Sequence, residues 1–63
     1  MNLDKLNRKA GELQREAQRL YEQVGSLMYD NETKGVTRLQ KDAVLFKIEH
    51  CKDCVREMEK ELK

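Results

Sequence analysis

The chain has 63 residues, of which 38% are hydrophobic and 40% are charged, and it contains no proline or tryptophan. Thirteen basic residues against twelve acidic ones leave a net charge of +1, so the overall balance gives no reason to expect binding to nucleic acid or to an anionic membrane. A chain this short forms one domain at most and rarely builds a core that is sufficient alone, so we expect it to gain stability from another chain.

A strict heptad pattern predicts a first long helix over residues 3–29. Asn2 is placed to cap its first turn, and Asp4 complements the helix dipole there. Small residues alternate with large ones along the apolar seam, which favours close packing of antiparallel helices. The seam residues recur at steps of three and four: Leu3, Leu6, Ala10, Leu13, Ala17, Leu20, Val24 and Leu27.

A polar segment over residues 30–36 breaks the heptad and predicts the turn. It contains Asn31 and Gly35, whose residue types tolerate left-handed backbone angles. Thr37 and Gln40 match a capping box, so a second helix is predicted over about residues 37–62. The apolar seam of this helix is Val44, Ile48, Cys51, Val55, Met58 and Leu62.

The matched lengths of the two predicted helices favour an all-α fold, an antiparallel two-helix hairpin that forms one domain over residues 1–63. Two helices facing each other bury only a strip of each seam, whereas four helices enclose the same side chains. We therefore expect two hairpins to pair as a homodimeric four-helix bundle with coiled-coil packing.

Several features predict a cytoplasmic protein that makes no membrane contact. The longest apolar run is Val44–Phe46, and the first residues lack the basic and then apolar layout of a signal peptide. Two cysteines three positions apart make no disulfide framework and suit a reducing compartment.

His50, Cys51 and Cys54 form the only conventional grouping of metal or redox residues. On a helix these three side chains could converge, but zinc usually takes four ligands, and the chain has no other cysteine or histidine. We interpret Cys51 and Cys54 as core residues and His50 as a surface or interface residue, and we predict no metal and no cofactor. A metal or redox role is the alternative.

Catalysis lacks suitable residues. The chain has one histidine and no glycine-rich phosphate loop, its acidic residues are scattered over faces expected to meet solvent, and a hairpin offers no deep pocket. We predict no catalytic residues and a protein that is not an enzyme.

Apolar residues outside the seams gather near the turn and predict a partner-binding surface. Gly25 is costly inside a helix, so its position between two tyrosines suggests close approach by another chain. A four-helix bundle also needs apolar flanks, so this surface serves either the homodimer core or a second protein. Its residues are Tyr21, Gly25, Met28, Tyr29, Leu39 and Phe46.

These features together predict a non-enzymatic protein–protein interaction module, a small adaptor or inhibitor whose compactness suggests a phage or mobile-element origin. The expected partners are a second copy of the chain and another protein. The alternative is an RNA-binding regulatory hairpin dimer, which would bind phosphates through basic residues around the start of the second helix. These basic residues are Lys34, Arg38, Lys41 and Lys47.

The segment over residues 20–29 carries Tyr21, Gly25 and Tyr29 at four-residue steps. This pattern resembles the helical stalk of small Firmicute proteins that end in a zinc ribbon and whose function is unassigned. The resemblance implies a helical stalk and no particular activity. The ribbon that defines those proteins has no counterpart here, because this chain has only two cysteines.

Overall fold

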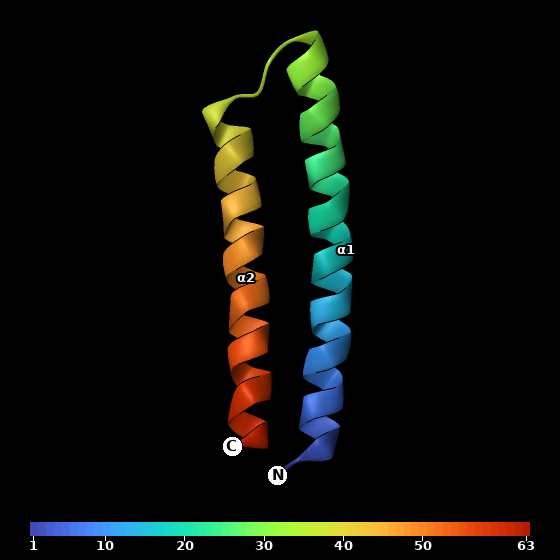
Figure 1. Cartoon of the computed structure of the whole chain (residues 1–63), viewed down its shortest axis with the longest axis vertical. Helices are drawn as coiled ribbons and strands as arrows, with labels where there is room; N and C mark the ends of the chain where they lie inside the picture. Colours follow the sequence, from blue (N-terminus) through green and yellow to red (C-terminus); the bar gives the residue numbers. More distant parts are fainter.

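The computed structural model describes residues 1–63 as two long antiparallel helices joined by a short turn (Figure 1). Helix α1 covers Leu3–Thr33, and helix α2 covers Arg38–Leu62. The two termini lie together at one end of the rod and the turn lies at the other. The prediction of an all-helical hairpin is confirmed.

Helix α1 begins where the sequence predicts it. Asn2 has an extended backbone, and its side-chain oxygen accepts a hydrogen bond from the backbone N–H of Lys5 at 3.0 Å. This bond satisfies one of the N–H groups that the first helical turn leaves without a partner. Asp4 adds a negative charge in the same turn, next to the positive end of the helix dipole.

Helix α1 continues four residues beyond the predicted end at residue 29. Its last turn is stabilised by the hydroxyl of Thr33, which donates to the backbone carbonyl of Tyr29 at 3.1 Å. The helix ends at Thr33 with Lys34 as its cap, and the chain turns away at Gly35, which has a φ of 85° and whose N–H donates to the carbonyl of Asp30 at 2.6 Å. A left-handed glycine after the last turn is a common helix terminator, because glycine has no Cβ and adopts a positive φ without strain.

Helix α2 begins with the predicted capping box. The hydroxyl of Thr37 accepts a hydrogen bond from the backbone N–H of Gln40 at 3.2 Å, and the side chain of Gln40 accepts one from the backbone N–H of Thr37 at 2.8 Å. Thr37 is thus the cap, and the first helical residue is Arg38.

The helices meet beside the predicted apolar seam and not along its centre. The two most buried residues are Cys54 and Glu16, whose exposed fractions are 2% and 6%. In α1 the leucine half of the seam is half-buried: Leu6, Leu13, Leu20 and Leu27. Three of the four residues in the other half are exposed: Leu3, Ala17 and Val24.

This offset follows from the helical period. Glu16 directly precedes Ala17, so a contact line centred on Glu16 turns Ala17 about 100° away from α2. In α2 the contact line passes through Cys54, which leaves Cys51 and Met58 half-buried but Val55 exposed. The two seams therefore meet at one edge only, and their other edges face outward.

The molecule is a rod measuring 48 × 16 × 12 Å. Its accessible surface is 5138 Å², whereas a compact monomer of 7.5 kDa exposes about 4,250 Å². The surplus of about 900 Å² resembles what each partner contributes to an interface of ordinary size, about 800 Å². The elongated two-helix rod thus exposes more surface than a compact protein of the same mass.

Candidate functional site

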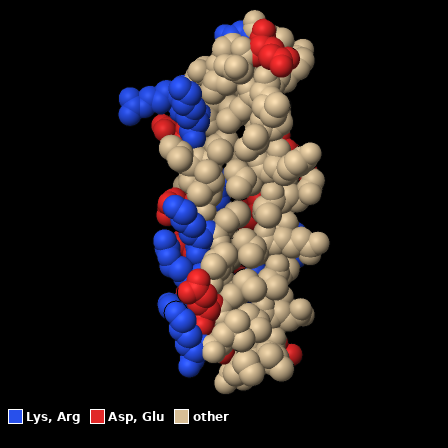
Figure 2. Space-filling view, in the orientation of Figure 1, with Lys and Arg blue, Asp and Glu red and all other residues tan.

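One broad face of the hairpin is nearly free of charge. Figure 2 shows uncharged side chains across the middle of both helices, with charged groups along the outer edge of α2 and at the turn end of the rod. Neither helix has a stretch with the length and hydropathy needed to cross a bilayer. The outward edges of both seams supply exposed hydrophobic side chains: Leu3, Val24, Val55 and Leu62.

A shallow apolar groove runs between the two helices. Helix α1 contributes Leu20 to its lining, and α2 contributes Ile48, Cys51 and Val55. Charged side chains border the groove on the α2 side: Lys52, Arg56 and Glu59. Apolar walls edged by charges are the ordinary anatomy of a protein–protein contact, with a hydrophobic centre and a polar rim.

The structure divides the partner surface predicted near the turn. All of its larger side chains are exposed, but they lie on different sides of the hairpin. Tyr21 and Met28 are seven residues apart and flank Val24 on α1, so they extend the apolar face. Gly25 is exposed as well, and a Cβ built there would meet no other atom within 4 Å.

The α2 part of the predicted surface lies across the contact line. Phe46 borders a hollow together with Glu49, His50 and Asp53, whereas the apolar groove lies on the opposite flank of Cys54. Leu39 precedes Phe46 by seven residues and shares its stripe. These two side chains are 80% and 73% exposed. Tyr29 is also exposed. It follows Met28 directly in the sequence, so its side chain points about 100° away from the stripe of Tyr21 and Met28.

The flank that carries Phe46 is polar, and it adjoins Glu16, which lies on the contact line between the helices. Lys47 Nζ donates to Glu16 Oε2 at 2.9 Å, and Arg19 donates to Glu16 Oε1 at 3.0 Å. The hydrogen bond from Lys47 is the main cause that lowers the pKa of Glu16 below its ordinary value, against the opposing effect of burial. Glu16 is therefore held as a carboxylate between the helices.

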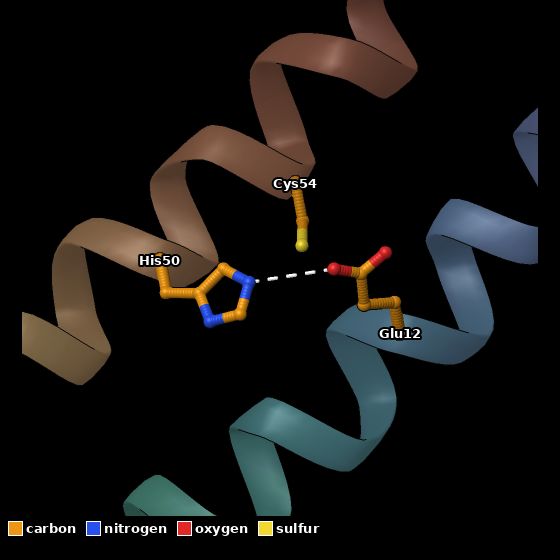
Figure 3. Close-up of side chains that lie close together, drawn as sticks. All are labelled: Glu12, His50 and Cys54. Atoms are coloured by element: carbon orange, nitrogen blue, oxygen red, sulfur yellow. Dashed lines mark hydrogen bonds and ion pairs between the residues drawn. The ribbon is translucent and has the colours of Figure 1, made fainter.

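Glu12, His50 and Cys54 form a cluster beside Glu16, with one side chain from α1 and two from α2 (Figure 3). His50 Nε2 lies 3.3 Å from Glu12 Oε1, and the thiol of Cys54 points toward both. A hydrogen bond from Lys9 is the largest cause that lowers the pKa of Glu12. Burial raises the pKa of the Cys54 thiol, and the charge of Glu12 adds to this effect.

No known protein family, curated protein or solved structure matches this chain.

The four basic residues of the predicted nucleic-acid surface do not act as one group. Lys47 is paired with Glu16 inside the hairpin, and its side chain is only 22% exposed. Lys34, Arg38 and Lys41 are exposed around the turn. The structure thus leaves three of the four cations available at this end of the rod.

Sequence reasoning placed the acidic residues on solvent faces and therefore missed Glu12 and Glu16. A signal for Glu16 is present in the sequence, because Lys9, Glu16, Gln23 and Asp30 recur every seven residues next to the seam. Helix α2 has a corresponding set at seven-residue steps next to its seam: Gln40, Lys47, Cys54 and Glu61. Two facing polar columns of this kind indicate hydrogen-bonded pairs across a hairpin, such as Glu16 with Lys47 and Asp30 with Gln40.

Proposed function

We propose that this chain is a non-enzymatic protein-interaction module, a small adaptor or inhibitor that pairs with a second copy of itself as a four-helix bundle. Each hairpin contributes its apolar face, the surface formed by the seam residues and the groove at Leu20, Ile48, Cys51 and Val55. A second hairpin would cover the outward edges of both seams and leave the charged edges in water.

The observation that carries this proposal is the mismatch between apolar surface and burial. Cys54 is the only hydrophobic residue that the lone hairpin buries, although 38% of the chain is hydrophobic. The rod exposes about 900 Å² more than a compact protein of its mass, which is enough for one interface of ordinary size. The apolar part of the area that a partner covers would stabilise the fold at about 25 cal/mol per Å².

A second copy suits this surface because the face is as long as the rod. A short peptide would cover part of the groove, whereas another hairpin of the same length offers matching rows of small and large seam residues. Closed twofold pairs are also the commonest way in which identical chains associate.

The stripe of Leu39 and Phe46 lies outside this face and would stay exposed in the dimer. We assign it to a different protein partner, since exposed aromatic and leucine side chains near one end of a rod can anchor a contact. Tyr21 and Met28 border the apolar face, so we assign them to self-association. The hairpin would then present its turn end to the partner and use its long face for the second copy.

Two aspartate substitutions separate the two surfaces. Val55→Asp places a carboxylate in the apolar part of the dimer interface, where removing it from water costs several kcal/mol, so self-association should weaken by at least about a hundredfold. Phe46→Asp adds the same charge on the opposite flank and should leave self-association unchanged. Sedimentation equilibrium of both variants gives the comparison.

Affinity capture from the native host tests the partner surface with the same two variants. Phe46→Asp should lose the proteins that the wild type captures, because the aromatic anchor is replaced by a charge. The proposal fails if Phe46→Asp abolishes self-association while Val55→Asp has no effect. It also fails if RNA, released by added salt, is what the wild type captures.

A further inference from the structure

We propose that Glu12, His50 and Cys54 bind a zinc ion between the two helices. One ligand atom from each residue can be chosen so that all three lie within 4.8 Å of one another (Figure 3). The three residues come from both helices, so a bound ion would join α1 to α2 in the half of the rod that carries the two termini. This set replaces Cys51, which the sequence grouped with His50 and Cys54 but which lines the apolar groove on the other flank.

The ligand types favour zinc over the other common cations. Imidazole nitrogen, thiolate sulfur and one carboxylate oxygen are a zinc set, whereas calcium and magnesium take oxygen ligands alone. With bonds of about 2.0–2.3 Å, neighbouring ligand atoms of a tetrahedral zinc site lie about 3.5 Å apart. The Nε2 to Oε1 distance of 3.3 Å already fits this geometry. A rotation of the Cys54 side chain would bring its sulfur to the same distance from the other two ligand atoms.

His50 is held in the orientation that metal binding needs. Its Nδ1 lies 3.3 Å from Glu16 Oε2, while its Nε2 faces Glu12 at the same distance. A neutral imidazole has only one N–H, so it can donate to one of the two carboxylates and turns a lone pair toward the other. A cation beside Nε2 would satisfy that lone pair and the Glu12 oxygen together. Glu16 then serves as the carboxylate that orients a metal-binding histidine.

The surroundings of the cluster also suit an ion. Lys9 contacts Glu12 Oε2, so Oε1, which faces His50 Nε2, is the oxygen that the metal would take. The cluster lies in the wall of a surface hollow, which gives an ion a path to the otherwise buried Cys54. A thiolate and a carboxylate balance the two charges of zinc, the thiol proton passes to solvent on binding, and water takes the fourth position.

Cobalt(II) titration of the full-length chain tests this site directly, since cobalt takes the place of zinc and absorbs light where zinc does not. We expect the chain to bind one cobalt ion. Its spectrum should show the visible bands of tetrahedral coordination and a thiolate-to-cobalt charge-transfer band, and added zinc should remove both. Cys51→Ser is the matched control and should keep every signal. Cys54→Ser should lose the charge-transfer band, and His50→Gln should weaken binding by at least about tenfold.

Circular dichroism of each variant shows whether it keeps the helical fold. If Cys54→Ser unfolds, the cobalt affinity of His50→Gln decides whether the site exists. His50 is partly exposed, so its replacement leaves no cavity. The proposal is overturned if the wild type binds no cobalt, or if Cys51→Ser removes the charge-transfer band while Cys54→Ser retains it. A stoichiometry of one cobalt per two chains overturns it as well, because the ion would then lie between copies.

Discussion

Glu61 connects the C-terminal end of α2 to the N-terminal end of α1. Its Oε2 accepts a hydrogen bond from the backbone N–H of Asn2 at 3.1 Å, and its Oε1 lies 3.3 Å from Lys5 Nζ. The backbone N–H of Asn2 is the largest cause that lowers the pKa of Glu61 below its ordinary value of 4.5, and Lys5 adds to it. The carboxylate form therefore stabilises the fold.

This arrangement predicts that the fold weakens in acid. The folded-state pKa of Glu61 is below its unfolded value, so around and below pH 4.5 the unfolded chain binds more protons. The stabilisation is fully present well above pH 4.5 and is lost as pH falls through the folded pKa. Urea unfolding across this range should show a smaller loss of stability for Glu61→Gln than for the wild type. Glu59→Gln, at an exposed residue that faces Lys63, should behave like the wild type.

At the residue scale, the sequence indicated the ligand types of the candidate site but not their grouping. His50 and Cys54 stand out as the histidine and one of two cysteines. Glu12 is one of many glutamates, and only the hairpin register brings it beside His50. That register depends on tertiary contacts between residues 38 positions apart, which heptad spacing within one helix does not contain.

At the element scale, the capping box of α2 gives a direct test of the turn. Thr37→Ala removes the hydroxyl that accepts the N–H of Gln40 and should lower the free energy of unfolding by about 1 kcal/mol. Thr37→Ser keeps the hydroxyl and should cost much less. Thermal unfolding at one fixed protein concentration compares the two variants. Equal losses would mean that the cap does not stabilise the helix.

Gly25→Ala tests whether another chain approaches α1 at that position. In the lone hairpin the added methyl group meets nothing within 4 Å, and alanine is the better helix former by about 0.8–1 kcal/mol. We therefore expect a higher free energy of unfolding and unchanged self-association. Weaker self-association would show that the glycine lies in close contact with the second copy, as the sequence pattern suggested.

The helix starts were predictable from the sequence, because Asn2 and Thr37 cap through contacts no more than three residues away. The end of α1 was not. Residues 30–33 are polar, which resembles a turn, but their backbone is helical, and the chain leaves the helix at Lys34 and Gly35, where Gly35 supplies a positive φ. Polarity marks exposure to water, whereas a helix ends where the backbone can leave it.

At the scale of the whole molecule, a hydrophobic seam does not have to be the line of contact. The heptads indicated two helices and their antiparallel packing, yet the lone hairpin places Glu16 and Cys54 at its centre and turns Val24 and Val55 outward. A seam wider than one neighbour can cover is typical of helices that have more than one neighbour. The exposed half of each seam is the structural basis for the proposed dimer.

Sedimentation velocity of the wild-type chain over a wide concentration range tests this claim most directly. Two hairpins that share their apolar faces should sediment as a species of twice the 7.5 kDa chain mass, with dissociation on dilution accompanied by loss of helical signal. A fully helical 7.5 kDa monomer at every concentration would contradict the account.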